Sequence, residues 1–173
     1  MKLKKWALIA EIVGGIAIVL SLAFVGYEIR LNNQRQVQST TQSIVSDYSV
    51  YVSLIAEDAA LACIYVRGGQ DYLGMTGADR VRFSALWISI LRVVEDMYYQ
   101  EKAGYVDSRI WSGIDATMRE SMQLPGMQQW FAQRGDWFSA EFREFLSGMI
   151  GDPTAGPALD WEDPQCHTRG STE

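Results

Sequence analysis

An apolar run from Trp6 to Tyr27 constrains this chain more than any other feature of its sequence. Glu11 is the only charged residue in the run, so a helix formed here would present almost no charge to its surroundings. At about 1.5 Å per residue, such a helix measures roughly 33 Å, slightly more than the ~30 Å hydrocarbon core of a bilayer. The run therefore predicts a single transmembrane helix over residues 6–27.

Residues at the ends of the run support this interpretation. Trp6 and Tyr27 lie where amphipathic rings favour the headgroup layer, and with Arg30 they form the predicted interface anchors. A secretory signal peptide is the alternative, because the N-terminus is basic and residues 21–23 (Ser-Leu-Ala) resemble a cleavage site. Glu11 argues against a signal peptide, since its carboxylate would lie inside the apolar region. We therefore expect an uncleaved span.

Small residues recur along one side of the predicted span, and their spacings alternate between three and four, which places them in one stripe on a helix. This small-residue stripe consists of Ala7, Ala10, Gly14, Ala17 and Ser21. In lipid, helices associate by close packing over small side chains. We predict that the stripe contacts another integral membrane protein subunit or a second copy of this chain.

Glu11 lies at the edge of the small-residue stripe, one to two turns inside the N-terminal end of the span. A carboxylate at this depth faces protein, water or a cation, because its exposure to lipid is costly. Glu11 is therefore either part of the predicted packing surface or close enough to the end to reach the membrane interface.

Basic residues on either side of the span favour one orientation. Lysines occupy positions 2, 4 and 5, whereas Arg30 and Arg35 follow the span. Lysine and arginine favour the cytoplasmic side, so the excess of one charge predicts a cytoplasmic N-terminus. We expect a single-pass protein of the bacterial inner membrane with the rest of the chain in the periplasm.

Helical periodicity continues as far as residue 150, and no alternating run is long enough for a sheet. The span is expected to continue as one helix to residue 57. Asp58, Asp107 and Ser139 are predicted to cap the starts of three later helices. Gly68 and Gly69 are interpreted as the end of the helix that follows Asp58, and Thr76 with Asp79 as a capping box for the longest helix. Further helices are predicted over residues 59–67, 78–103, 108–123, 127–134 and 140–150. The fold class is therefore all-α, with the transmembrane helix continuing into a small helical bundle.

These patterns divide the chain into a basic flank (1–5), the span (6–27), a helical domain (28–150) and an acidic tail (151–173). The tail holds three of the four prolines and has the composition of a disordered segment. Its sizeable apolar residues are flanked by acids and are a candidate anchor for a partner or for the chain's own domain. They are Leu159 and Trp161.

The cysteines and the histidine indicate no metal site. We expect Cys63 to be a buried reduced thiol, since free cysteine packs as a small hydrophobe, and the alternative is a disulfide that joins the tail to the domain. His167 lies beside Cys166, and these two ligands fall short of the four that tetrahedral zinc needs. No metal or other cofactor is predicted.

Catalytic patterns are also lacking in the sequence. No histidine precedes the tail, so Ser-His and Cys-His nucleophiles are excluded there, and no phosphate-binding glycine loop occurs. The acids Glu95, Asp96 and Glu101 lie near Tyr98 and Tyr99, but a ferritin-like di-iron site would require Glu-x-x-His motifs. We interpret the acids as a solvated ion-pair face, with the tyrosines covering the edge of the core, and predict no enzyme.

Aromatic residues are concentrated in the second half of the chain. We expect them to form the core of the bundle rather than a ligand cage, because aromatic side chains bury the most surface. They are Trp87, Trp111, Trp130, Phe131, Trp137, Phe138, Phe142 and Phe145. The net charge of −6 and the scattered arginines provide no basic face, so nucleic acid is excluded as a partner.

Three segments carry a resemblance to known proteins: "GGIAIVLSLAFVGYEIRLNN", "DMYYQEKAGYVDSRIW" and "LPGMQQWFAQRGDWFSAEFREFL". Together they make residues 9–150 similar to a widespread group of uncharacterised bacterial proteins with one N-terminal span and a small helical domain. The resemblance implies architecture and no activity. The lysines at positions 2, 4 and 5 depart from that pattern, and without them the resemblance favours the opposite orientation.

These observations favour a membrane-anchored helical interaction protein, an accessory or assembly subunit of a larger membrane protein complex. A self-associating membrane sensor or signalling module is one alternative. A helical domain that binds lipid or a small ligand is another.

Overall fold

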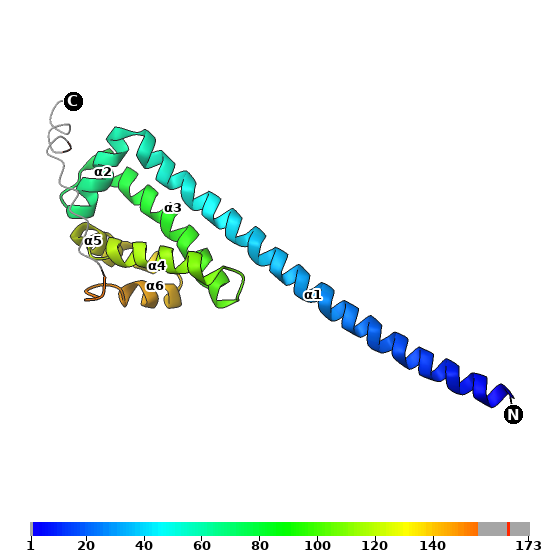
Figure 1. The fold of residues 1–173 in the computed structure, drawn as a ribbon. Helices are drawn as coiled ribbons and strands as arrows, with labels where there is room; N and C mark the ends of the chain where they lie inside the picture. The colour runs from blue at the N-terminus through cyan, green and yellow to red at the C-terminus, as the bar shows by residue number, and fades with distance from the viewer. Residues whose placement is uncertain (1, 156–165, 167–173) are drawn as a thin grey trace. The chain divides into compact units, whose positions relative to one another are not determined.

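The computed structural model describes residues 2–155 and Cys166, except for the side chains of residues 2–5 and 7–10. Figure 1 shows that the described chain consists of helices joined by short turns. The elements are α1 (Lys2–Glu57), α2 (Ala59–Gln70), α3 (Gly77–Lys102), α4 (Ser108–Ser121), α5 (Pro125–Arg134), the 3₁₀ helix η1 (Gly135–Trp137) and α6 (Ala140–Ser147). The described residues contain no strand, so the predicted all-α fold with a long apolar N-terminal helix is confirmed.

The chain divides into two units, Met1–Ser39 and Thr40–Glu173. The described part of the first unit is entirely helical and belongs to α1. The second unit contains the rest of α1 and the other helices, and the buried residues of the core lie in it. As predicted, no break occurs in α1 between residues 28 and 57, a range without glycine or proline.

Side-chain caps begin several helices where the sequence predicted them. Asp58 accepts hydrogen bonds from the backbone N–H groups of Ala60 and Leu61 at the start of α2. Asp107 and Ser139 cap α4 and α6 in the same way. Such caps satisfy backbone donors that have no partner within the helix.

The capping box predicted for α3 is wrong. Thr76 is the N-cap residue, but its side chain makes no capping hydrogen bond. The carboxylate of Asp79 instead pairs with Arg67 on α2, with an Nη2–Oδ2 distance of 2.7 Å. Asp79 thus forms a long-range ion pair rather than part of the capping box that the local sequence pattern predicted.

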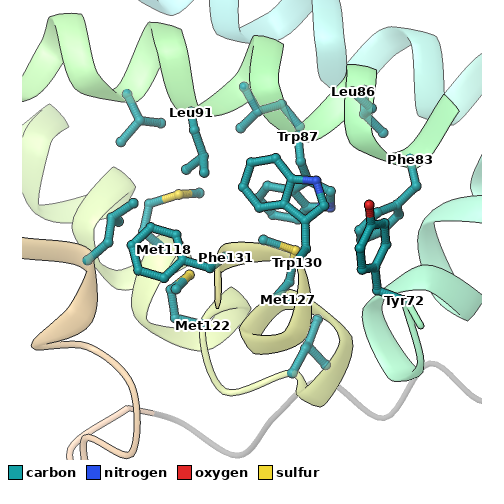
Figure 2. Close-up of a cluster of buried hydrophobic side chains, with 14 of the residues drawn as sticks. Tyr72, Phe83, Leu86, Trp87, Leu91, Met118, Met122, Met127, Trp130 and Phe131 are labelled. Carbon is teal, nitrogen blue, oxygen red and sulfur yellow. The ribbon is translucent and has the colours of Figure 1, made fainter. Parts of the chain in front are cut away.

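Aromatic and methionine side chains fill the core between α3 and the shorter helices. Figure 2 shows Trp87 and Leu91 extending from α3 toward Trp130 and Phe131 of α5. Trp87 and Trp130 are each at most 1% exposed. Seven of the eight aromatic residues predicted for the core lie in it or pack against it, and Trp137 is the exception at 49% exposure.

Glycines bring α2 and α5 close together. The prediction that Gly68 and Gly69 end a helix is wrong, because α2 continues through them to Gln70. A Cβ atom at Gly126 of α5 would lie 2.7 Å from the carbonyl oxygen of Gly69 and closer still to that of Gly68. The glycine pair therefore serves helix packing rather than helix termination.

We predict that Gly126→Ala destabilises the helical domain by about 1–3 kcal/mol, because the added methyl group meets backbone that cannot rotate away. Gly113→Ala is the matched control, since Gly113 lies exposed within α4 and its Cβ would meet nothing within 4 Å. That control should gain up to about 1 kcal/mol from helix propensity. Denaturant unfolding of both proteins, followed by circular dichroism, measures the difference. Equal stability of the Gly126→Ala variant and the wild type would contradict the packing role.

Candidate functional site

The N-terminal part of α1 is the most distinctive surface of the chain. Its most apolar 18-residue window has a mean hydropathy of 2.1, and no part of that window is buried. The bulky apolar side chains here are 49–67% exposed: Ile12, Val13, Ile16, Ile18, Val19, Leu20, Leu22, Phe24 and Val25. A contiguous apolar surface of this kind marks a membrane or protein contact rather than ordinary solvent-exposed surface.

The energetics of insertion favour a membrane for this helix. At about −0.3 to −0.6 kcal/mol for each Leu, Ile, Val or Phe, the nine bulky residues together favour the bilayer by roughly 3–5 kcal/mol. A charged residue at the centre of a span opposes insertion by about 3 kcal/mol, and less near an end, where Glu11 lies. The helix is thus long and apolar enough to cross a membrane.

The residues predicted for helix packing lie uncovered on α1. Gly14, Ala17 and Ser21 are exposed, and a Cβ atom at Gly14 would meet nothing within 4 Å. Glu11 is also exposed. Ala7 and Ala10 belong to α1, but their side chains lie outside the described residues. The small-residue stripe stays a prediction.

The predicted interface anchors are exposed as well. Trp6 is 71% and Tyr27 63% exposed, and Arg30 follows Tyr27 by one helical turn. The tail residues Leu159 and Trp161 lie outside the described residues, as does His167.

A disulfide joins Cys63 of α2 to Cys166, across a sequence separation of 103 residues. The expectation that Cys63 is a reduced thiol is therefore wrong. Its burial was correctly predicted, with 8% exposure for Cys63 and 4% for Cys166, but burial alone does not distinguish a thiol from a disulfide. Structural disulfides persist in oxidising compartments and are rare in the cytosol of mesophiles.

Glu95 is the one buried carboxylate among the described residues, at 9% exposure, and this corrects its assignment to a solvated face. Its Oε1 accepts a hydrogen bond from the backbone N–H of Ser139 at 2.8 Å, and its Oε2 accepts one from Arg92 at 2.7 Å. Burial raises the pKa of Glu95, but hydrogen bonds from Ser139 and Arg92 more than offset that effect, so its pKa lies below the ordinary value. The charged carboxylate thus fixes the start of α6 against α3.

The neighbours of Glu95 take structural roles. Tyr99 shares a hydrogen bond with the Ser139 hydroxyl at 2.6 Å, and the Tyr98 ring packs 4.7 Å from that of Phe145. Asp96 is exposed and accepts a hydrogen bond from Gln100. Both oxygens of Glu95 are occupied by protein donors, so the cluster holds helices together rather than presenting a free base. Across the part of the chain that the structure describes, no group of three or more His, Cys, Asp or Glu residues is arranged to hold a metal ion.

Comparison with known proteins gives no matching family model, characterised protein or solved structure. The resemblance drawn from the sequence therefore stays an expectation.

We predict that Glu95→Gln destabilises the domain by about 1 kcal/mol at pH 7, because it replaces charge-assisted hydrogen bonds with neutral ones. A carboxyl with a lowered folded-state pKa stabilises the fold above its unfolded pKa, and this contribution is lost as the pH falls through the folded value. The difference between Glu95→Gln and wild type should therefore be largest near neutrality and should shrink as the pH falls below about 4.3, the ordinary pKa of a glutamate. Thermal unfolding from pH 3 to 8 measures it.

Asp96→Asn is the control for this experiment, since Asp96 is exposed and its carboxylate accepts a hydrogen bond from Gln100, its neighbour on the same helix. Its effect should stay within about 0.5 kcal/mol at every pH. A Glu95→Gln difference that is independent of pH would show that the charge of this carboxylate does not matter.

Proposed function

We propose that this chain is a single-pass membrane protein whose span binds another integral membrane protein, so that the chain acts as an accessory or assembly subunit of a larger complex. The observation that carries the proposal is the exposed apolar surface of α1, which is long enough to cross a membrane. Within lipid, such a surface needs no cover, but its small residues favour a neighbouring helix. The proposal assigns the chain no catalytic role.

Two independent features support an orientation with the N-terminus in the cytoplasm. The lysines at positions 2, 4 and 5 outnumber Arg30 and Arg35 by one. The disulfide between Cys63 and Cys166 favours an oxidising compartment for the helical domain. In a bacterium with two membranes that compartment is the periplasm. The excess of basic residues before the span is only one charge. The disulfide supports the same orientation independently of charge.

The substitution Gly14→Leu tests whether the span binds a partner helix through the small-residue stripe. A leucine in the small-residue stripe should block close approach of a second helix and reduce co-purification of a heteromeric partner from native membranes at least tenfold. Gly15→Leu is the matched control, because Gly15 lies at the same depth but about 100° around the helix. A Cβ atom at either glycine would meet nothing within 4 Å, so neither change disturbs the chain's own packing.

Equal recovery of the partner with Gly14→Leu and Gly15→Leu would contradict the role of the stripe. Recovery of only a second copy of this chain would favour the self-associating sensor or signalling module over the accessory subunit. Both outcomes are read from the same purification in mild detergent.

The orientation is tested by fusing alkaline phosphatase after Glu173 in a bacterial host, since that enzyme folds only where its disulfides form. We expect an active fusion, and a fluorescent protein that folds only in the cytoplasm should be dark at the same position. Changing Lys2, Lys4 and Lys5 to Gln should lower phosphatase activity, because it reverses the charge difference. An inactive phosphatase with a fluorescent partner fusion would reverse the assignment.

A further inference from the structure

Residues 31–40 of α1 form a stretch of helix without an apolar face. Most residues of this stretch are polar: Asn32, Asn33, Gln34, Arg35, Gln36, Gln38, Ser39 and Thr40. The apolar residues Leu31 and Val37 are six positions apart, which places them on different sides of a helix with 3.6 residues per turn. A helix that is polar on every side has no face that packs on a hydrophobic core.

The burial of α1 changes just after this stretch. No residue from 31 to 40 is buried, and most of them are exposed. At the next position, Thr41 Oγ1 accepts a hydrogen bond from the backbone N–H of Asp107 at 3.3 Å. Ile44 follows one turn later, is 5% exposed and packs with Met97 and Val106 in the core. Packing against the helical domain therefore supports α1 from Thr41 onward.

Charge pairs along the helix give this stretch no support either. Opposite charges three or four positions apart stabilise a helix that is exposed to water. The charged residues between positions 28 and 46 are Glu28, Arg30 and Arg35, and the acid lies two and seven positions from the arginines. These spacings do not bring opposite charges together on one face of the helix. The order of residues 31–40 therefore depends on the helix propensity of the residues themselves.

That propensity is low. Half of the stretch consists of weaker helix formers, namely Asn32, Asn33, Val37, Ser39 and Thr40. Asparagine, serine and threonine side chains compete with the helix by bonding nearby backbone groups in other conformations. Even a sequence of good helix formers is marginal in water as an isolated helix shorter than about 12–15 residues. The stretch is helical because the flanking parts of α1 nucleate it, and little else holds it.

We propose that residues 31–40 are a joint that exchanges between helix and coil while the rest of α1 stays helical. The inference rests on the proposed span, because lipid then supports α1 as far as Tyr27 and Arg30, and the domain supports it from Thr41. Local opening of this kind is confined to the least supported part of a structure. The joint lets an accessory subunit turn its helical domain toward a partner without moving its span.

The test is hydrogen–deuterium exchange of the full chain in phosphatidylcholine nanodiscs, read by mass spectrometry. Backbone amides exchange when their hydrogen bonds open, so the rate along α1 reports where the helix opens. Amides of the joint should exchange roughly 100-fold faster than those of residues 44–55, which the domain core supports. Residues 12–25 should exchange slowly, because the bilayer excludes water from their backbone.

A double variant, Asn32→Ala with Asn33→Ala, raises the helix propensity of the joint. Both asparagines are exposed, so the change leaves the packing of the domain as it is. It should slow exchange of the joint about five- to tenfold, because alanine is the best helix former. Ser46→Ala with Ser53→Ala is the matched control, since both serines are exposed on α1 beyond Thr41. That control should leave exchange of the joint unchanged.

Three results would overturn the proposal. Equal exchange over residues 31–40 and 44–55 would show that α1 opens as one unit. Equal exchange of the joint in the asparagine variant and the wild type would show that weak helix formers do not control its opening. Both results contradict the joint and leave the proposed function standing. Fast exchange over residues 12–25 as well would contradict the span and the joint together.

Discussion

The helical domain depends on the close crossing of α2 and α5 at Gly68 and Gly126. No side chain fits between these two backbones, because a Cβ atom at Gly126 would meet the carbonyl oxygens of α2. The crossing sets Trp130 of α5 in the core, fully buried with Trp87 of α3. The position of α5 in the core thus depends on a close approach that only glycine permits at residue 126.

Two further interactions join elements that lie far apart in the sequence. Glu95 binds the backbone of Ser139, 44 residues away, and so positions the first turn of α6. The disulfide joins Cys166, which follows α6 in the sequence, to α2. In the chain-entropy account, closing a loop of about 100 residues stabilises a fold by roughly 4–5 kcal/mol. These links matter in a small domain, because such a domain buries a limited fraction of its surface.

The sequence predicted the features that are encoded locally. The caps Asp58, Asp107 and Ser139, and the periodicity between them, were sufficient for the helices. The predictions that were wrong concern contacts between residues far apart in the sequence. The glycine pair in α2 was interpreted as a helix end, and Cys63 as a thiol, because their partners lie far along the chain. Trp137 was assigned to the core with the other aromatic residues of the second half of the chain, but it is 49% exposed, and the guanidinium carbon of Arg134 lies 4.9 Å from its ring centre.

On our proposal, the glycines of the span also serve close helix packing, but in lipid rather than in water. Gly14 and Gly15 each weaken an isolated helix by about 1 kcal/mol relative to alanine, and a Cβ atom at either position would meet nothing within 4 Å beyond the surrounding helix. In water that cost would have no compensation. In lipid the hydrophobic effect no longer drives helices together, so close backbone approach becomes a main source of association, and glycine permits the closest approach. On our proposal, the compensation comes from a neighbouring helix, and Gly14, which lies in the stripe, contributes more of it than Gly15.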